Sequence, residues 1–438
     1  MKSATRRGLR VRVGGAVASA LVVVGVSFAP GATAADVQSE QWYLGPMQAE
    51  KMWKVSTGEG VKVAVIDTGV NPETPSLKGQ VLADEVPKQV AYGAMDDYEG
   101  HGTTMAELIA GTGAEGGIQG LAPGAEIVPY RVALGDLIDA KEGKLAPTPW
   151  AAIKAAADSD VRIINISMGS PAYEPEFEAA VRYAASKGKL LIAAVGNEGR
   201  DSGYIAYPAA YPYVIGVSSI DEKSNISGFA QSGNYVDLVA PGEDIPGYCK
   251  PSFDKYCPDM PGTSSATAIT SAAAALIWSA HPDWTANQVT RSLIDTAGRK
   301  WPKDKPTATA GYGTIRPRSV LANPAYEAGE PYSDPLRKEN TQEGEKLVTE
   351  IPPAAASSKP SEPSEASESS AGATAASQGA EGAFGDNQAA AGSDGAKAVA
   401  AAASSDSSST LWIALGAAAA VVVIGGGAFA VLRARRAN

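Results

Sequence analysis

A serine-rich segment stands directly before a long, alanine-rich stretch that favours helix. Residues 261–282 read PGTSSATAITSAAAALIWSAHP, which places Ser264 and Ser265 at the expected helix start. Two interpretations are open at this point. Serine hydroxyls commonly cap the free amides of a first helical turn. A serine there also suits nucleophilic attack, because the same amides and the positive end of the helix dipole stabilise an oxyanion. Other residues must decide between them.

A serine nucleophile needs a base, and the chain contains only two histidines. His281 lies in SAHPDWT, directly before a proline and between two helical patterns, which is typical of a local helix-end residue. His101 lies in EGHGTTMAELIAG, where the flanking glycines permit close approach of the backbone. His101 is therefore the candidate base.

Two further polar residues stand at the ends of apolar segments. Asp67 ends VKVAVID, and Asn197 ends KLLIAAVGN. Taken alone, each is better explained as a turn residue whose side chain bonds a nearby amide. In acyl transfer, however, a carboxylate orients the base, and an amide donor facing an oxyanion contributes about 3–4 kcal/mol. The order Asp67, His101, Asn197, Ser264 supplies each of these groups once.

The segments around these residues alternate between two patterns. Continuous apolar runs predict buried strands, and longer amphipathic or alanine-rich runs predict helices. This alternation predicts an α/β fold with a mostly parallel sheet covered by helices on both faces, and a site beyond the carboxyl ends of the strands. The expected strands are 61–67, 126–133, 161–169, 189–197, 213–220 and 235–242, and the expected helices are 103–110, 149–157, 174–187, 264–280 and 285–297.

The two ends of the chain read as targeting segments. Five basic residues precede an apolar run of about 16 residues (13–28) and then Ala32-Thr33-Ala34, which predicts a signal peptide over 1–34. An uncleaved anchor is the alternative. Residues 411–432 are uncharged and are followed by three arginines in 433–438, which predicts a transmembrane helix with a cytoplasmic tail. A buried helix is the alternative. We therefore expect a single-pass cell-membrane protein whose folded domain is extracellular.

Composition separates the folded part from a linker. Residues 327–410 are rich in Ser, Ala, Glu and Pro and carry few large apolar residues, which predicts disorder. One folded domain is left, with no internal repeat. Removing the five basic residues of the leader and the three of the tail from the net charge of −11 leaves −19 for the exported part. Such a surface repels phosphate backbones, so nucleic acid is not an expected partner.

The chain has two cysteines, Cys249 and Cys257, with seven residues between them. In an exported protein this pair predicts one disulfide that closes a short loop. Two free thiols remain the alternative. A metal site is disfavoured, because no further Cys or His ligands lie nearby.

Six blocks in one order resemble the signature segments of the subtilisin-like serine proteases, or subtilases. They are VAVIDTGV, GHGTTMAELIAG, INISMGS, AAVGNEG, YPAAYPYVIGVSSID and GTSSATA, within about residues 57–300. The resemblance implies that Asp67 orients the ring of His101, that His101 is general base and then acid, and that Ser264 attacks the carbonyl. It also implies that the Asn197 side chain and the Ser264 amide form the oxyanion hole.

The same resemblance implies where a peptide binds. Ser167, Met168 and Gly169 pair with the substrate backbone, Ala194, Val195 and Gly196 line the primary specificity pocket, and Ala206 lies at its base. The chain departs from many subtilases at three positions near the catalytic residues. Thr104 replaces a histidine, Ser265 a methionine and Ala268 a proline. These changes leave the proton-moving groups in place and put packing and specificity in doubt.

A narrower resemblance is to the mycosins, membrane-anchored subtilases associated with type VII secretion. It is carried by QWYLGPMQAEKMWKVSTGEGVKVAVIDTGV (41–70) together with the signal peptide, the small disulfide loop, the linker and the anchor. It implies that residues 35–56 pack on a peptidase domain spanning 57–326. It further implies a protein or peptide substrate and a secretion complex as partner. No calcium loop is evident, so no metal and no cofactor are expected.

Two functions of different classes follow. The first is an active endopeptidase that cleaves exported proteins, and the second is a structural partner that stabilises a secretion complex while proteolysis is secondary.

Overall fold

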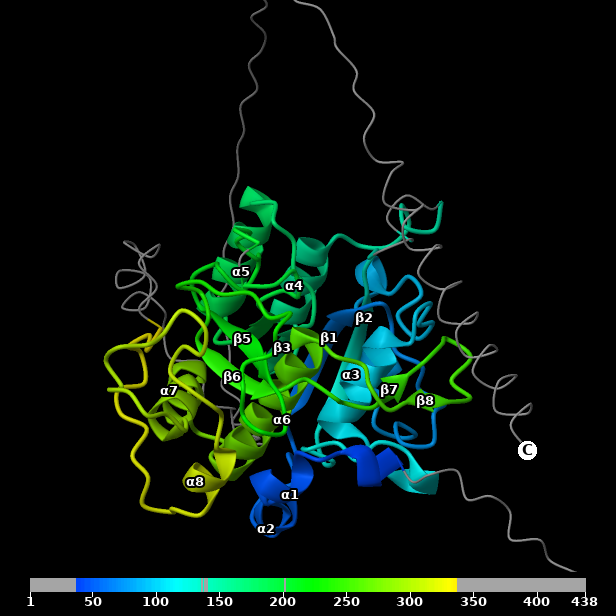
Figure 1. Cartoon of the computed structure of the whole chain (residues 1–438). Helices are drawn as coiled ribbons and strands as arrows, with labels where there is room; N and C mark the ends of the chain where they lie inside the picture. Colours follow the sequence, from blue (N-terminus) through cyan, green and yellow to red (C-terminus); the bar gives the residue numbers. More distant parts are fainter. Residues whose placement is uncertain (1–36, 135–136, 138–140, 201, 337–438) are drawn as a thin grey trace, which may run out of the picture. The chain divides into compact units, whose positions relative to one another are not determined.

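Six buried strands form the central sheet of the computed structural model, which describes residues 37–134, 137, 141–200 and 202–336 (Figure 1). All of the described residues belong to one compact unit of the chain. The strands are all parallel and lie in the order β2-β1-β3-β4-β5-β6. Their bounds are β1 Lys62–Asp67, β2 Glu126–Arg131, β3 Ile163–Ile166, β4 Leu190–Ala194, β5 Val214–Ile220 and β6 Leu238–Pro241.

Helices cover both faces of this sheet, and the side chains of β1 show the division. Val63 and Val65 belong to the core formed with α3, α6 and α7, whereas Ala64 and Ile66 belong to the core formed with α4 and α5. A strand buried on both faces reads as a continuous apolar run, which is why the strands are recognisable in the sequence. The helices are α3 His101–Ala110, α4 Pro149–Ala157, α5 Pro175–Ser186, α6 Thr263–Ala280 and α7 Ala286–Thr296.

Helix α6 is buried along most of its length, including every residue from Ser265 to Trp278. It packs against β3, β4, β5 and β6 and against α3 (Figure 1). Its many alanines permit this close approach, and a helix that is apolar all round requires such burial. Residue 264 is thereby placed in the first turn of a rigid central helix.

The predicted strands and long helices are confirmed, and most of their ends shift by one to three residues. The strands over 161–169 and 189–197 end early, at Ile166 and Ala194, because the chain leaves the sheet to form loops at the site. Several short elements were not predicted. They are α1 Leu44–Met47, α2 Ala49–Trp53, α8 Pro317–Leu321, the hairpin of β7 Gly247–Tyr248 and β8 Tyr256–Cys257, and four 3₁₀ turns at Val37–Glu40, Ala83–Glu85, Lys88–Val90 and Ala114–Gly116.

The segment before β1 packs into the main core. Tyr43 is fully buried and Met52 nearly so, and both belong to the cluster that contains α3 and α6. The indole of Trp42 donates to the carbonyl of Glu243 (3.0 Å), and that of Trp53 donates to the carbonyl of Leu121 (2.9 Å). Residues 37–56 are thus part of the folded unit.

Residues 328–336 also pack on this unit, although their composition resembles the linker that follows. Arg291 of α7 donates to the carbonyls of Ala328, Glu330 and Ser333, and Leu336 is buried. The first residues of the predicted 327–410 linker are therefore held by backbone contacts that composition does not reveal.

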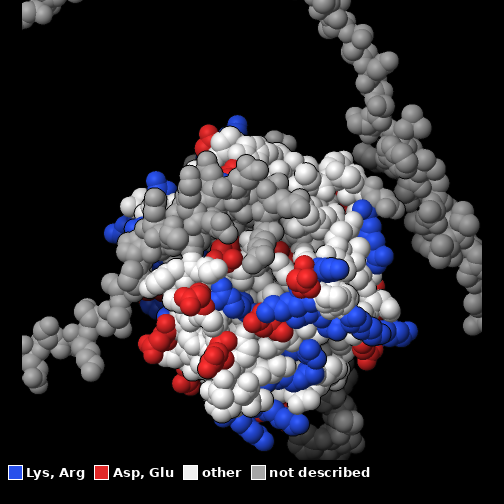
Figure 2. Space-filling model, turned by 90° about the vertical axis from the view of Figure 1, so that its left-hand side faces the viewer, with Lys and Arg blue, Asp and Glu red and all other residues white. Residues whose placement is uncertain are grey.

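The predicted signal peptide (1–34), transmembrane helix (411–432) and tail (433–438) lie outside the described residues. Within residues 37–336, where described, no helix has the length and hydropathy needed to cross a membrane. The side of the molecule that carries α7 shows Lys and Arg side chains next to Asp and Glu side chains (Figure 2). One such pair joins Lys303 to Asp295. Acidic and basic groups are therefore mixed on this face, despite the net charge of −11.

Candidate active site

Asp67 and His101 meet where β1 ends and α3 begins. Asp67 is fully buried, and its Oδ1 lies 2.6 Å from Nδ1 of His101. Burial of the imidazole lowers its pKa, but the neighbouring carboxylates of Asp67, Asp97 and Glu99 outweigh this and raise the pKa of His101 to about 9. The pair therefore holds the ring in one orientation and stabilises its protonated form.

Glycine permits the close approach of α3 to the end of β1. A Cβ on Gly102 would lie 2.1 Å from the carbonyl oxygen of Gly69 and 3.0 Å from Cβ of Asp67. Gly100 has φ +87°, the left-handed region that glycine tolerates, and the helix begins at the next residue. The two glycines flanking His101 thus set its distance from Asp67.

Asp97 fixes the start of α3 and was not predicted from the sequence. Its Oδ1 accepts from Thr68 Oγ1 (2.7 Å) and from the amide of Gly100 (2.8 Å). Its Oδ2 accepts from the amide and the hydroxyl of Thr103, at 2.8 and 2.6 Å. Asp97 lies three residues before Gly100, the N-cap residue of α3, so it does not occupy the position at which sequence signals for a helix start are read.

Ser264 lies in the first turn of α6, one residue after the helix begins. Its hydroxyl donates to the carbonyl of Ser167 (3.0 Å), and the Ser167 hydroxyl donates back to the carbonyl of Ser264 (3.1 Å). Ser264 therefore does not cap the helix. Among the described residues its hydroxyl is bonded to this carbonyl and not to the His101 ring. Ser265 is buried, whereas Ser264 is partly exposed.

Asn197 lies beside the start of α6, with its amide group oriented by Thr263. Oδ1 of Asn197 accepts from both the backbone amide and the hydroxyl of Thr263, each at 2.9 Å. The other side-chain atom of Asn197, Nδ2, is therefore directed away from Thr263. A Cβ built on Gly262 would lie 3.6 Å from Nδ2 of Asn197 and 3.6 Å from the amide nitrogen of Ser264. The two predicted oxyanion donors thus flank one small space. Thr263 is a further contributor that the sequence did not single out.

The predicted substrate-binding residues come together beside this site. Ser167, Met168 and Gly169 follow β3, and Ala194, Val195 and Gly196 follow or end β4. A Cβ on Gly169 would lie 3.6 Å from Cβ of Ala206 and 3.7 Å from the carbonyl oxygen of Ala194. Small residues from three separate segments therefore converge, as expected for the walls of a side-chain pocket.

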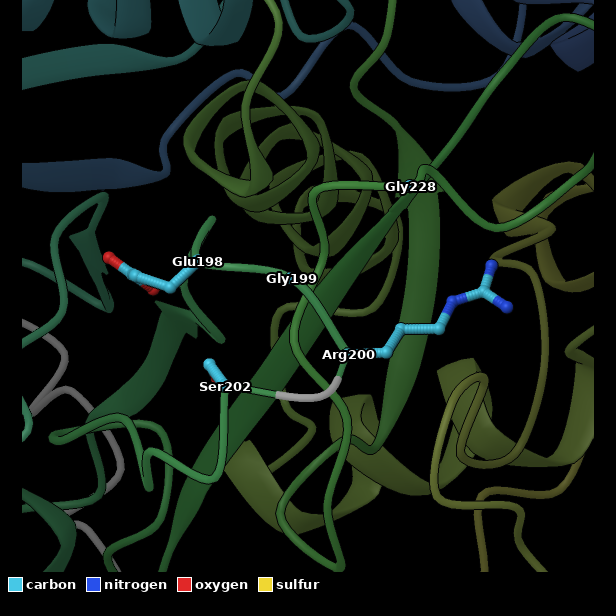
Figure 3. Close-up of a pocket in the computed structure, with 5 residues that line it drawn as sticks. All are labelled: Glu198, Gly199, Arg200, Ser202 and Gly228. Atoms are coloured by element: carbon cyan, nitrogen blue, oxygen red, sulfur yellow. The ribbon is translucent and has the colours of Figure 1, made fainter.

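An open depression lies just past Asn197 (Figure 3). It has a volume of about 670 Å³ and is lined by Glu198, Gly199, Arg200, Ser202 and Gly228. The side chains of Glu198 and Arg200 point away from each other. The side chain of Glu198 accepts from the backbone amide of Asn197 (2.9 Å). This hydrogen bond helps to hold the loop that carries Asn197.

The remaining sequence candidates have structural positions. Cys249 and Cys257 form a disulfide, with 5.1 Å between their Cα atoms. His281 ends α6 and stacks on Trp284 with ring centroids 3.8 Å apart, which agrees with its interpretation as a helix-end residue. Within the described part of the chain, no three His, Cys, Asp or Glu side chains lie close enough to hold a metal ion.

Known proteins with similar sequences are serine proteases, in agreement with the geometry of the site. The family model described as the subtilase family matches residues 58–314. The major intracellular serine protease of Bacillus subtilis (strain 168) is 34% identical over 283 residues, covering 61% of this chain and 85% of the relative. Subtilisin Savinase of Lederbergia lenta is 35% identical over 265 residues, covering 59% and 92%.

Solved structures give the same result. The serine protease MycP1, described as an essential component of the type VII (ESX-1) secretion system, is 29% identical with a TM-score of 0.53, covering 66% of this chain and 90% of its own. MycP1 from Mycobacterium smegmatis is 26% identical with a TM-score of 0.52, covering 67% and 86%. With a family match over more than half of its length and a buried Asp–His pair beside a helix-borne serine, the chain belongs to the subtilase family of serine proteases.

Proposed function

We propose that the chain is an endopeptidase that hydrolyses peptide bonds through an acyl-enzyme formed on Ser264. The observation that carries this proposal is the 2.6 Å contact between Asp67 Oδ1 and His101 Nδ1, at a site that also contains Ser264 and Asn197. A carboxylate bound to Nδ1 leaves Nε2 as the nitrogen that exchanges protons.

The reaction follows from these positions. The Ser264 hydroxyl turns from the Ser167 carbonyl to Nε2 of His101, loses its proton to that nitrogen and attacks the scissile carbonyl carbon. The oxyanion accepts hydrogen bonds from Nδ2 of Asn197 and from the amide of Ser264. His101 then protonates the leaving amine, and a water molecule deprotonated by His101 hydrolyses the ester. Asp67 remains ionised throughout and stabilises the imidazolium.

The peptide lies along the residues that follow β3. Its backbone pairs with Ser167–Gly169 as an added strand, a mode in which main-chain hydrogen bonds bind and one side-chain pocket selects. No large side chain fills that pocket at three of its positions, which are occupied by Gly169, Ala194 and Ala206. The proposed substrate class is therefore an extended peptide segment with a sizeable side chain before the cleaved bond.

The proposed setting is the outer face of a cell membrane. The signal-like segment 1–34, the linker 327–410 and the apolar segment 411–432 support an exported peptidase domain tethered by its C-terminal helix. The likeness to MycP1, described as a component of a type VII secretion system, supports a mycosin-type role beside such a complex. These assignments rest on the sequence and on relatives.

Cleavage by the full-length chain in detergent tests the endopeptidase. Exported proteins are incubated with wild type and with Ser264→Ala, and new peptide termini are identified by mass spectrometry. We expect new termini with wild type and a loss of about 10⁶-fold in rate with the variant, comparable to removal of a triad serine. Equal cleavage by both proteins would assign the activity to a contaminant.

A second candidate function is that of a structural partner of the secretion complex. It is favoured by the description of MycP1 as an essential component of its system. Cells that carry Ser264→Ala and cells that lack the whole chain separate the two functions. Secretion retained with the variant and lost with the deletion supports the structural role, whereas secretion lost in both supports the peptidase.

A further inference from the structure

A disulfide hairpin lies beside α3, the helix that carries His101, and it precedes α6, the helix that carries Ser264, in the sequence. It consists of β7 and β8 with their loop, residues 247–257, and is closed by the Cys249–Cys257 disulfide. Figure 1 shows it beside α3, and the chain leads from Cys257 to Ser264 in seven residues. The hairpin is therefore in contact with the helix of His101 and is joined to Ser264 by a short segment.

The hairpin is attached to α3 next to His101. The amide of Tyr248 donates to the hydroxyl of Thr104 (3.0 Å), which itself donates to the carbonyl of Gly100 (2.8 Å). A Cβ on Gly100 would lie 3.2 Å from Cβ of Tyr248, so the hairpin packs on the residue that precedes His101. Thr104, where many subtilases carry histidine, thus serves as a hairpin anchor in this chain.

A second anchor is Glu107, a fully buried carboxyl six residues after His101 on the same helix. Its Oε1 accepts from Thr74 Oγ1 (2.8 Å) and from the Tyr248 hydroxyl (3.0 Å), and its Oε2 accepts from the Tyr256 hydroxyl (2.8 Å). Among the described residues no Lys, Arg or His pairs with it. A buried carboxyl without a counter-charge favours its neutral form.

The number of protons available in this cluster also favours a neutral Glu107. The hydroxyls of Tyr248 and Tyr256 are also 2.8 Å apart, so three oxygen–oxygen contacts join the two phenols and Glu107 in a ring. Two phenols bring only two protons. With an ionised carboxylate one of these contacts has no proton, whereas a neutral carboxyl supplies the third and completes the ring.

We propose that Glu107 is a positioning residue that binds a proton and thereby locks the disulfide hairpin against the helix carrying His101. In the neutral form the carboxyl donates its proton from Oε2 to Tyr256, Tyr256 donates to Tyr248 instead of to Glu107, and Tyr248 donates to Oε1. When Glu107 ionises, the ring loses one hydrogen bond and a negative charge is left in a buried site. The hairpin then opens more readily, and its hold on Gly100 and Thr104 weakens.

The electrostatic surroundings agree with this assignment. Burial raises the pKa of Glu107 to about 7, against the opposing hydrogen bonds from Tyr256, Thr74 and Tyr248. The titratable groups that face it are the two hairpin tyrosines, whose own pKa values burial and this carboxyl raise. Thr74 does not titrate, and α6, which packs on α3, has no charged residue. The strands β1 and β2 also pack on α3, and their charged residues are Lys62, Asp67, Glu126 and Arg131. Of these, Lys62, Asp67 and Arg131 pair with Glu85, His101 and Asp96. His101 is the nearest ionisable group on its own helix.

Reduction of the hairpin disulfide by a phosphine reductant measures opening without relying on catalysis. The rate is measured on the folded full-length chain in detergent from pH 5 to 8.5 and divided by that of a small disulfide peptide. We expect the wild-type rate to rise through pH 7. For each unit by which the pKa of Glu107 is lower in the open hairpin than in the closed one, the reduction rate should rise by about a further tenfold.

Glu107→Gln is the matched variant, because glutamine keeps the shape, donates from its amide and never ionises. Its normalised reduction should stay slow at every pH, whereas Tyr256→Phe, which breaks the ring, should be reduced fast at every pH. Equal pH dependence in wild type and Glu107→Gln would overturn the proposal. If Glu107→Gln does not fold, amide exchange of residues 247–257 in wild type decides. A loss of amide protection in this segment as the pH rises through 7 supports the proposal, and protection that does not change with pH refutes it.

The consequence for catalysis rests on the proposed endopeptidase. The ratio of kcat/KM between wild type and Glu107→Gln should fall as pH rises through 7, because only the wild-type hairpin loosens. A constant ratio together with pH-dependent reduction would refute the positioning role but leave the proton lock standing. A chain without peptidase activity would refute the proposed function and leave the reduction result unaffected.

Discussion

At the scale of single residues, the Asp67–His101 pair depends on groups that do not touch the substrate. Asp97 accepts hydrogen bonds from Thr68, next to Asp67, and from Gly100 and Thr103, on either side of His101. Its carboxylate also contributes to the raised pKa of His101. Asp97 therefore acts on both the position and the protonation of the base.

Asp97→Asn should lower kcat/KM by about tenfold, because a charged hydrogen-bond acceptor contributes about 1.5–3 kcal/mol and part of it is retained by asparagine. Activity requires a neutral ring, so kcat/KM rises with pH through the pKa of His101, and the wild-type midpoint should lie above 6.5. Removing a negative charge lowers that pKa and moves the midpoint to lower pH. A pH–rate profile measures both effects.

The matched control for this variant is Asp96→Asn. Asp96 is the adjacent acidic residue, its side chain is 81% exposed and it pairs with Arg131. We expect a much smaller shift of the midpoint. A midpoint in Asp97→Asn that stays unchanged or rises would contradict the role given to Asp97.

Gly262 tests the oxyanion site. Its φ of 177° suits any residue, but an alanine methyl would lie 3.6 Å from each of the two donors, Asn197 Nδ2 and Ser264 N. We expect Gly262→Ala to lower kcat by about 10²-fold, as for loss of one oxyanion donor, with little change in KM. In Gly228→Ala a Cβ meets nothing within 4 Å, so this control should retain activity. Equal kcat in both variants would place the oxyanion elsewhere.

At the scale of elements, helix ends explain why the scaffold was predictable. Thr285 caps α7 with a complete capping box to Gln288, and Thr148 caps α4 ahead of Pro149. These residues are start signals that the sequence displays openly. The predicted bounds of α4 match the structure, and those of α7 extend one residue too far at each end. The hairpin of β7 and β8 gave no such signal, because two-residue strands have no measurable periodicity.

Thr285→Ala should destabilise the protein without affecting the chemistry. The substitution removes the capping box and the bond from Thr285 Oγ1 to the carbonyl of Pro331 (2.7 Å). We expect a loss of about 1 kcal/mol and a fall in Tm of about 2–4 °C. Thermal unfolding and kcat/KM are measured together. A drop in kcat/KM at unchanged Tm would mean that α7 takes part in the reaction.

The site itself was predictable only in part. Asp67, His101, Asn197 and Ser264 lie at strand ends or helix starts, where type and order are informative. Thr263 orients Asn197 through hydrogen bonds between residues 66 positions apart, which no local pattern displays. Glu107 sits in an apolar helix, where a lone glutamate normally indicates the solvent face. Its burial is explained by hydrogen bonds from Thr74 and from the two hairpin tyrosines, which are distant in sequence.

At the scale of the whole molecule, the segment before β1 is integral to the fold. Tyr43 and Met52 are buried in the core that contains α3 and α6, and Gln41 exchanges hydrogen bonds with the backbone of Gln119. Such burial is typical of a structural segment, and a removable inhibitor would contact the active site.

Deletion of residues 35–56 should therefore lower stability and not raise activity. The core would lose two fully buried large side chains, each worth about 1.5–3 kcal/mol, and the exposed surface would favour aggregation. Thermal unfolding and peptidase assays are compared with a chain that lacks only residues 1–34. A truncated chain with unchanged Tm and higher activity would identify the segment as an inhibitor.

The most direct test of the proposed peptidase is where a fluorophosphonate probe reacts. Such a probe forms a stable adduct only with a serine whose proton is removed by an adjacent base and whose oxyanion site is formed. The full-length chain is labelled, digested and sequenced by mass spectrometry, with Ser264→Ala and Ser265→Ala as paired controls. We predict one adduct, on Ser264, which disappears in Ser264→Ala and persists in Ser265→Ala. A folded wild-type chain that stays unlabelled, or an adduct on another residue, would contradict it.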